Sequence, residues 1–311
     1  MKGKIFEVFN RKPVEIPIIA VTGGKGGTGK TTVAVNLTVT LSNKGHRILL
    51  VDTDVDSPTT AIVYGVESKP VQEVKIFTPK INEEKCTKCG KCVNACRAHA
   101  LIQIAEKSPM FFEQLCSGCE ACILACPHGA IENGGKTVGL INQSSNNNVN
   151  LIGGELKPNE ARSAQVVTAT KDYAFKKTAK ENFDMMVVDT PPGSHCNVVQ
   201  SLRCADLALA VTEPTPLGIY DLDLILQLAA ILKIPTHVII NKADAPGHDK
   251  EGIHEVVKRY ETEVIGEVPF DKKLFQAPVD GNPFITTYPE SKVSKAFMEV
   301  SESVLRQITK R

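Results

Sequence analysis

The sequence lacks the features that would place the protein at a membrane, outside the cell or on nucleic acid. Its formal net charge is +1, so no global electric field attracts it to nucleic acid or anionic lipid. No stretch approaches the ~18 apolar residues that a membrane-spanning helix needs. Residues 1–12 are mixed and charged, unlike a secretory signal. We therefore expect a cytoplasmic protein that binds neither nucleic acid nor membrane.

Short apolar runs indicate the fold class. Such runs are typical of buried parallel strands, and we assign strands at 18–21, 47–52, 165–168, 185–189, 207–212 and 237–241. Helical spacing of apolar residues lies between them, as at Val33, Leu37 and Leu41, with Gly45 as a stop signal. The alternation predicts an α/β fold, with a mostly parallel sheet and helices on both faces.

A glycine-rich segment follows the first predicted strand. Residues 24–31, GKGGTGKT, match the Walker A pattern between a strand and a helix. The backbone N–H groups of such a loop bind phosphate at a helix N-terminus. Lys30 is expected to neutralise the β- and γ-phosphates and Thr31 to hold Mg²⁺. The predicted nucleotide-binding residues of the loop are Gly24, Lys25, Gly26, Gly27, Thr28, Gly29, Lys30, Thr31 and Thr32.

Cysteine spacing identifies a second feature. Eight of the ten cysteines form two runs with the same C-x₂-C-x₂-C-x₃-C spacing, which is that of bacterial ferredoxins with [4Fe–4S] clusters. Zinc is the alternative, but zinc prefers paired C-x₂-C units. We predict two clusters in a ferredoxin-like α+β insertion at 77–138, between two parts of one nucleotide-binding domain at 1–76 and 139–311. The ligands are Cys86, Cys89, Cys92, Cys96, Cys116, Cys119, Cys122 and Cys126.

The remaining features receive simpler interpretations. The polar tract 142–150 is expected to be a solvated loop. Cys196 and Cys204 are interpreted as small buried thiols, with an orientation of Cys196 towards the nucleotide or a dimer interface as the alternative. His195 is interpreted as a solvent-facing or capping residue, with metal ligation as the alternative. Arg97 stands where the first cysteine run would usually have proline, and we expect it to shift a cluster potential. The apolar stripe Phe297, Val300, Val304 and Ile308 is expected to pack on the core, although a membrane-binding amphipathic helix is the alternative.

The loop GKGGTGKTT, with Lys25 as its second lysine, resembles the deviant Walker A signature of the MinD/ParA/Mrp ATPases, which are related to the nitrogenase iron protein. The resemblance implies an ATP-dependent homodimer in which Lys25 reaches the partner's nucleotide. It further implies that Asp54 positions the attacking water and that Asp52 and Asp189 belong to the Mg²⁺ shell. Gly193, in the Asp-Thr-Pro-Pro-Gly segment, would offer its N–H to the γ-phosphate.

The choice of base rests on residues 241–244, Asn-Lys-Ala-Asp. In GTPases the Asp of such a tetrad reads guanine, which would give Asp244 that role. In the MinD-like family the Asn after the same strand contacts adenine, which would give that role to Asn241. We favour ATP because of Lys25. Residues 268–271 also resemble a family segment that packs near the base.

A second resemblance, to dicluster ferredoxins, assigns the cysteines to clusters. In such modules the fourth cysteine of each run ligates the other cluster. We call Cys86, Cys89, Cys92 and Cys126 the first set. The second set is Cys116, Cys119, Cys122 and Cys96.

Three functions are compatible with these motifs. The first is an ATPase that hydrolyses ATP, slowly or when stimulated by a partner, and couples its nucleotide state to electron transfer with a redox partner. The second is an iron–sulfur cluster carrier of the Mrp type, which would deliver a cluster to an acceptor protein. Mrp carriers use a C-terminal C-x₂-C to bridge a dimer, and this sequence has none. The third is a positioning ATPase with the clusters as a redox sensor.

Overall fold

The computed structural model describes residues 12–245 and 249–309, and a nine-stranded sheet forms its centre. Seven strands run parallel, in the spatial order β13 (Val264–Val268), β12 (Thr236–Asn241), β11 (Leu207–Thr212), β1 (Ile18–Thr22), β10 (Met185–Asp189), β2 (Ile48–Asp52) and β9 (Val149–Leu156). Two antiparallel strands complete one edge: β8 (Lys136–Asn146) and β3 (Lys69–Ile76). The predicted α/β class with a mostly parallel sheet is confirmed.

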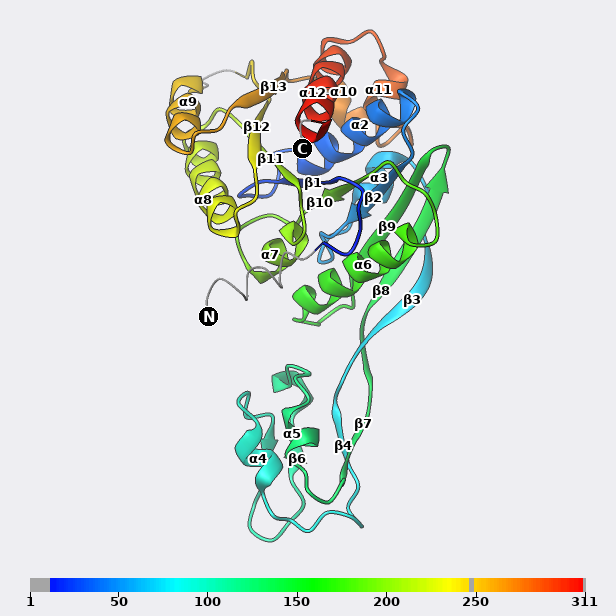
Figure 1. Cartoon of the computed structure of the whole chain (residues 1–311), viewed down its shortest axis with the longest axis vertical. Helices are drawn as coiled ribbons and strands as arrows, with labels where there is room; N and C mark the ends of the chain where they lie inside the picture. The colour runs from blue at the N-terminus through cyan, green and yellow to red at the C-terminus, as the bar shows by residue number, and fades with distance from the viewer. Residues whose placement is uncertain (1–11, 246–248, 310–311) are drawn as a thin grey trace.

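Helices cover both faces of the sheet (Figure 1). One face packs against α2 (Lys30–Asn43), α3 (Thr60–Tyr64), α10 (Lys273–Gln276), α11 (Phe284–Thr287) and α12 (Lys292–Thr309). The other packs against α6 (Ser163–Thr178), α7 (Cys196–Leu202), α8 (Pro216–Leu232) and α9 (Lys250–Arg259). Alternate strand residues enter opposite cores, so Ile18 and Ile19 lie on different faces. This double burial explains why the parallel strands are continuously apolar.

The eight clustered cysteines lie beyond the far end of the β3–β8 ribbon, below the main body in Figure 1. The segment contains β4 (Pro79–Ile81) paired with β7 (Ile131–Asn133), and β5 (Leu101–Ile102) paired with β6 (Met110–Phe111). Two short helices, α4 (Lys91–Ala95) and α5 (Ala121–Leu124), and a 3₁₀ turn at Glu113–Leu115 complete it. Its small core is formed by Phe77, Leu101, Cys122 and Ile131.

Two local predictions are wrong. Residues 165–168 are not a strand but part of α6, whose buried Val166, Val167, Thr170 and Ala174 follow helical spacing. The tract 142–150 is not a solvated loop, because it forms the end of β8, a tight turn and the start of β9. Its polar side chains are tolerated because an antiparallel edge can face water on one side.

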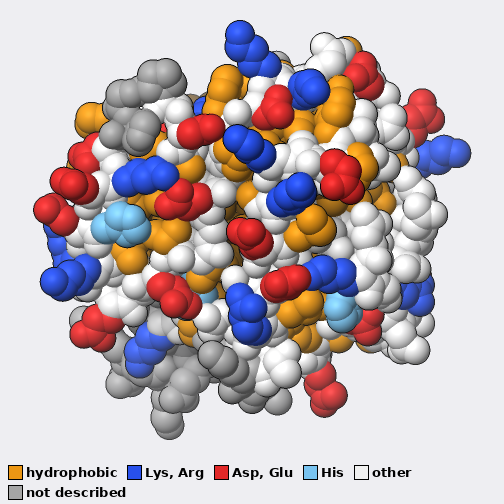
Figure 2. Space-filling view, turned by 90° about the horizontal axis from the view of Figure 1, so that it is seen from above, with side chains coloured by type: hydrophobic (Ala, Val, Ile, Leu, Met, Phe, Trp, Pro, Cys, Tyr) orange, Lys and Arg blue, Asp and Glu red, His pale blue; other side chains and the backbone are white. Residues whose placement is uncertain are grey.

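The C-terminal stripe packs on the core, as expected. Phe297, Val300 and Val304 of α12 are fully buried against the cluster that contains α2, while the flanking Lys310 and Arg311 lie outside the described residues. No helix in the described ranges is both long and apolar enough to span a bilayer. Acidic and basic side chains are interspersed on the face shown in Figure 2, in agreement with the near-zero net charge.

Candidate functional site

The glycine-rich loop connects β1 to α2 at the carboxyl edge of the parallel strands. Gly27 and Gly29 have φ values of +81° and +92°, a region that favours glycine. A Cβ on Gly29 would lie 2.2 Å from Asn241 Nδ2. The amide of Asn241, in turn, donates to Thr28 O at 2.8 Å. The loop conformation therefore depends on a glycine that also makes room for the Asn241 side chain.

A cavity of about 350 Å³ opens in front of this loop. Six of the predicted loop residues line it, together with Asp54 and Asn241; the six are Gly26, Gly27, Gly29, Lys30, Thr31 and Thr32. Phe270, Leu274 and Phe275 form an apolar wall, beside which Asp271 also lines the cavity. In the sequence, only the 268–271 segment had suggested this wall. A volume in this range is typical of small-molecule sites. Phosphate-binding backbone and an apolar wall together suit a nucleotide.

Lys30 is held inside the loop. Its Nζ donates to Lys25 O at 2.7 Å, and the residue is only 6% exposed. Burial lowers the pKa of Lys30, while the carboxylates of Asp189, Asp54 and Asp221 act in the opposite direction. The structure thus places a buried cation, hydrogen-bonded to the loop backbone, at the wall of the cavity.

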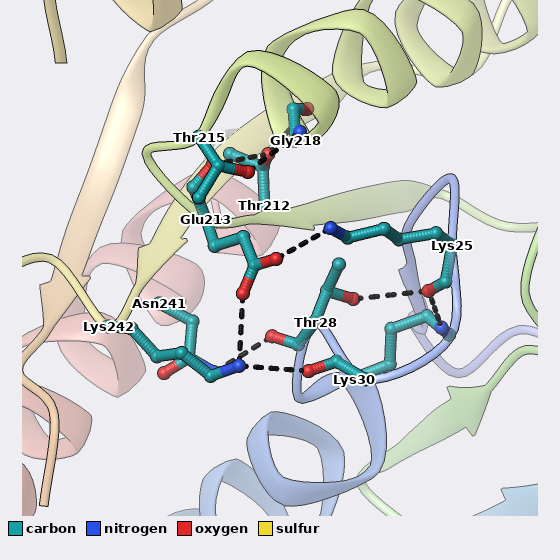
Figure 3. Close-up of polar contacts among 10 residues, drawn as sticks. Lys25, Thr28, Lys30, Thr212, Glu213, Thr215, Gly218, Asn241 and Lys242 are labelled. Carbon is teal, nitrogen blue, oxygen red and sulfur yellow. Dashed lines mark hydrogen bonds and ion pairs between the residues drawn. The ribbon is translucent and has the colours of Figure 1, made fainter. Parts of the chain in front are cut away.

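Lys25 lies outside the cavity and forms an ion pair within its own chain. Its Nζ is 2.7 Å from Glu213 Oε1, and Glu213 Oε2 accepts from Lys242 Nζ at 2.9 Å. Lys242 also donates to Gly27 O at 3.2 Å. Figure 3 shows Glu213 between the two lysines, just beyond β11. Despite its partial burial, both lysines hold the pKa of Glu213 below its usual range.

Two aspartates, Asp52 and Asp189, end the neighbouring strands β2 and β10 beside the cavity, and a third, Asp54, follows β2 by two residues. Asp52 and Asp189 are almost completely buried, and both contact Thr60, whose N–H donates to Asp52 Oδ2 at 3.1 Å and whose hydroxyl donates to Asp189 Oδ2 at 3.0 Å. Burial raises the pKa of each. Asp189 Oδ1 has no hydrogen-bond partner, which leaves an acceptor available to a cation or its water. Burial also raises the pKa of Asp54, to about 6.

Two residues that were predicted to contact the nucleotide make other contacts in this structure. The N–H of Gly193 donates to Gly23 O at 3.4 Å, although its neighbour Pro192 lines the cavity. Asp244 does not line the cavity, and its Oδ1 accepts from the backbone N–H of Phe270 at 2.6 Å. In this structure the Asp244 carboxylate therefore binds the backbone of the segment that carries the apolar wall.

The eight clustered cysteines are distributed over two cavities. The cysteines lining one are Cys86, Cys89, Cys92 and Cys126, and those lining the other are Cys96, Cys116, Cys119 and Cys122. These are the first and second sets, and no disulfide joins any of the ten cysteines. In the part of the chain that the structure describes, no three His, Cys, Asp or Glu side chains converge closely enough to hold a single metal ion.

The backbone around the two sets is arranged alike. The N–H of Ala100 donates to Cys96 Sγ at 3.2 Å, and the N–H of Ala130 donates to Cys126 Sγ at 3.3 Å. Both cysteines are fourth in their runs, and each faces the other run's set. Gly118 N also donates to Cys116 Sγ at 3.4 Å. Such donors stabilise negative charge on sulfur.

The two cysteines outside the runs differ from each other. Cys204 is buried, as expected, but Cys196 is exposed, so the prediction of a buried thiol is wrong for it. Cys196 is the first residue of α7, where a side chain points into solvent, and His195 is exposed at the preceding N-cap position. Arg97 is exposed beside the second-set cysteine Cys96.

Sequence reasoning missed Thr60 and Glu213. A threonine eight residues after Asp52 carries no motif, and its role follows from the way α3 returns to the strand ends. Glu213 directly follows β11. An acidic residue at the carboxyl end of a parallel strand lies at the same edge of the sheet as the lysine-containing phosphate loop. This position could have identified Glu213 as a partner of those lysines.

The comparisons with known proteins agree with this geometry. The CobQ/CobB/MinD/ParA nucleotide binding domain matches residues 19–284. The chain belongs to this family. Its members include nucleotide-binding ATPases, and the matched range contains the glycine-rich loop described above.

Relatives and solved structures of this family span most of the chain. The uncharacterized protein MJ0579 of Methanocaldococcus jannaschii is 35% identical over 272 residues, covering 87% of this chain and 92% of its own. An iron-sulfur cluster carrier protein of Pyrococcus furiosus is 26% identical and covers 93% and 86%. The crystal structure of the cell division ATPase MinD of Pyrococcus furiosus has a TM-score of 0.61 at 20% identity, covering 94% and 99%. That likeness establishes the fold.

Proposed function

We propose that the protein is an ATPase whose nucleotide state controls electron transfer through two [4Fe–4S] clusters, one held by each cysteine set. The observation that carries this proposal is the division of eight cysteines over two cavities, four in each, with every set drawing one ligand from the other run. Thiolates are the usual ligands of such clusters, which supply one-electron redox chemistry when bound.

The donor set fits a cluster better than a single ion. The four cysteines of a set surround a cavity instead of meeting at one point, and no convergent single-ion group occurs among the described residues. A cube of four irons and four sulfides spreads its ligands in this way, whereas tetrahedral zinc draws four sulfurs to about 2.3 Å of one centre. N–H donors to Cys96, Cys116 and Cys126 would further stabilise the thiolates.

The nucleotide is proposed to be ATP with Mg²⁺, in a homodimer. Lys30 and the loop amides would bind the phosphates, and Thr31, Asp52 and Asp189 would hold Mg²⁺ directly or through water. Asp54, at the cavity edge, would orient the attacking water. Lys25 would leave Glu213 to reach the partner's nucleotide. ATP is favoured over GTP because Asp244 is engaged by Phe270 and Asn241 lines the cavity.

The experiment is anaerobic purification with iron and sulfide counts, followed by EPR of the dithionite-reduced protein with and without Mg–ATP. We expect about eight irons per chain and a spectrum that changes with nucleotide. The rate at which a small dye oxidises the reduced protein, measured by stopped-flow spectroscopy, should then differ with and without Mg–ATP. Identical spectra and identical rates would contradict the coupling of the two functions.

A cluster carrier is the second candidate, because several relatives bear that name. It predicts that iron and sulfide move to an apo-ferredoxin in a nucleotide-dependent manner. Two features argue against a carrier. The proposed ligands come from both ends of one folded segment, which encloses the clusters within a single chain. Cys196 and Cys204 do not form the C-x₂-C pair with which Mrp carriers bridge a dimer. Clusters that stay with the protein under all nucleotide conditions would exclude this function.

A further inference from the structure

Arg162 connects the main α/β sheet domain, through α6, to the segment that carries the second cysteine set. It is the residue just before α6, and only 8% of it is exposed. Its Nε and Nη2 donate to Cys116 O at 2.9 and 2.7 Å, and Nη2 also donates to Glu113 O at 2.7 Å. One buried guanidinium thus holds the turn in which the second run begins.

A small group of charges fixes Arg162 in this position. Glu160 Oε1 lies 2.5 Å from Arg162 Nη1, and Glu160 Oε2 lies 3.0 Å from Lys136 Nζ. Lys136, at the start of β8, also pairs with Glu113 at 2.8 Å. Although burial opposes it, these cations hold the pKa of Glu160 below its usual range. Hydrogen-bonded ion pairs shielded from water are geometrically specific, so movement of Arg162 should move Cys116.

The opposite side of α6 is tied to α7. Lys171 is buried, and its Nζ donates to Ser201 O at 2.7 Å and to Arg203 O. The Thr168 hydroxyl donates to Gln200 Oε1 at 3.4 Å. Lys171 therefore binds the carboxyl end of α7, whose last carbonyls have no partners within the helix.

The other end of α7 reaches the nucleotide cavity. Cys196 begins the helix three residues after Gly193, whose N–H donates to the O of Gly23, the residue before the phosphate loop. Pro192, next to Gly193, lines the cavity. Along α6, Arg162 and Lys171 are separated by about 13 Å at the rise of a helix. Direct contacts thus run from the cavity through α7 and α6 to Cys116.

The first set has no equivalent connection. In residues 12–245 and 249–309, the hydrogen bonds and ion pairs of its cysteines and their neighbours stay within the segment 77–135, as with Gln103 to Lys88 O and Lys85 to Glu132. The two sets are therefore unequal with respect to the nucleotide site.

We infer that Arg162 is a positioning residue that makes the second cysteine set, and not the first, respond to the nucleotide. The inference rests on the proposed function, since it requires both a bound nucleotide and redox clusters. A nucleotide that moves residues 190–195 displaces α7, and α6 carries the displacement to Arg162. The guanidinium then shifts relative to Cys116, which changes the hydrogen bonding and the local charge that set a cluster potential.

The test compares Arg162→Gln, Arg162→Lys and the control Arg97→Gln. Arg97 is also a cation beside a second-set cysteine, but it is exposed. Each full-length variant is purified anaerobically, its iron and sulfide are counted, and both cluster potentials are titrated by EPR with and without Mg–ATP.

We expect Mg–ATP to shift one potential in the wild type and in Arg97→Gln. The shift should fall to less than half in Arg162→Gln and be partly restored in Arg162→Lys. A full shift in Arg162→Gln overturns the role of Arg162 while leaving the proposed function intact. Absence of iron or of any nucleotide effect in the wild type overturns both.

A second measurement decides the matter if Arg162→Gln loses iron. Hydrogen exchange of the wild-type holoprotein is recorded with and without Mg–ATP. The inference requires a change in residues 113–118 and none in residues 86–92. Equal changes in both segments, or none in either, contradict it.

Discussion

Glu213 lies between a lysine of the phosphate loop and a lysine that follows β12, with one carboxylate oxygen 2.7 Å from Lys25 Nζ and the other 2.9 Å from Lys242 Nζ. Lys25 is thus satisfied within its own chain and does not line the nucleotide cavity. An isolated chain should bind nucleotide without needing this amine, whereas a catalytic role across a dimer would require it to leave Glu213.

Lys25→Ala should therefore separate binding from hydrolysis. We expect the ATPase rate to fall at least tenfold, about 1.4 kcal/mol or more of transition-state stabilisation, while the Kd of a fluorescent ADP analogue rises less than threefold. Lys30→Ala is the matched comparison, since Lys30 lines the cavity and should lose both. Equal losses of binding and turnover in Lys25→Ala would contradict the separation.

Asp54 and Asp56 allow a second comparison between a test variant and a matched control. Asp54 lines the cavity, whereas Asp56 is exposed two residues later and does not. We expect Asp54→Asn to lower ATP hydrolysis by about two orders of magnitude or more, in the range of general-base effects, with nucleotide affinity retained. Asp56→Asn should hydrolyse ATP at the wild-type rate. The roles would be wrongly assigned if steady-state assays showed the reverse order.

Gly29 should be intolerant of a side chain. Alanine there meets a φ of +92° and a Cβ position 2.2 Å from Asn241 Nδ2, and strain of this kind costs on the order of 1–3 kcal/mol. We expect Gly29→Ala to lower the free energy of unfolding by about that amount. A Cβ on Gly26 would meet open space, so Gly26→Ala is the control. Denaturant titration without nucleotide compares them, and equal stabilities would refute the steric argument.

Lys171 predicts a pH dependence of stability. Burial lowers its pKa to about 7, with the Arg203 charge acting in the same direction and Cys204 and Asp172 opposing. Between pH 7 and the pKa of Lys171 in the unfolded chain, this amine is protonated in the unfolded state but not in the folded state. The free energy of unfolding must then rise with pH, by at most about 1.4 kcal/mol per unit. Below that range the amine is protonated in both states and contributes no slope.

The check compares the wild type with Lys171→Met by chemical denaturation from about pH 6 to pH 9.5. The wild type should gain stability relative to the variant above pH 7, because the other titrating groups cancel in the difference. A difference that stays constant across the range would show that the buried amine does not titrate there.

The cysteine sets predict which substitutions remove iron. Cys89→Ser should lose about half of the iron, since one of the two proposed clusters loses a ligand, and Cys196→Ser should lose none because Cys196 lies outside both cavities. Iron and sulfide analysis of anaerobic samples measures both. Full iron in Cys89→Ser would argue against the assignment of the first set.

The sequence predicted the elements that carry strong local signals. The runs 185–189 and 207–212 coincide with β10 and β11, because strands buried on both faces must be apolar throughout. The strand prediction for residues 165–168 was wrong because two adjacent valines suit a buried helix as well as a strand. Only the packing of this segment against β9 and α7 decides between the two.

The site was predictable only in part for a related reason. Residues of the phosphate loop are neighbours in sequence, so a pattern contains them. Glu213, Thr60 and Arg162 act through contacts with residues far away in the chain, and no local pattern records such contacts. In the proposed homodimer, the position of Lys25 would also depend on the nucleotide and on a second chain, which one sequence does not reveal.

The ribbon that leads to the cysteines has a topological consequence. Ile76 and Lys136 face each other in the β3–β8 ladder, so the chain leaves and re-enters the sheet at adjacent positions. Residues 77–135 are thus equivalent to an enlarged hairpin turn, and the order of the strands does not depend on what that turn contains. If the proposed clusters are bound, a single insertion at one bend is enough to add redox chemistry to a nucleotide-binding framework, and a different insertion would fit at the same place without changing the sheet.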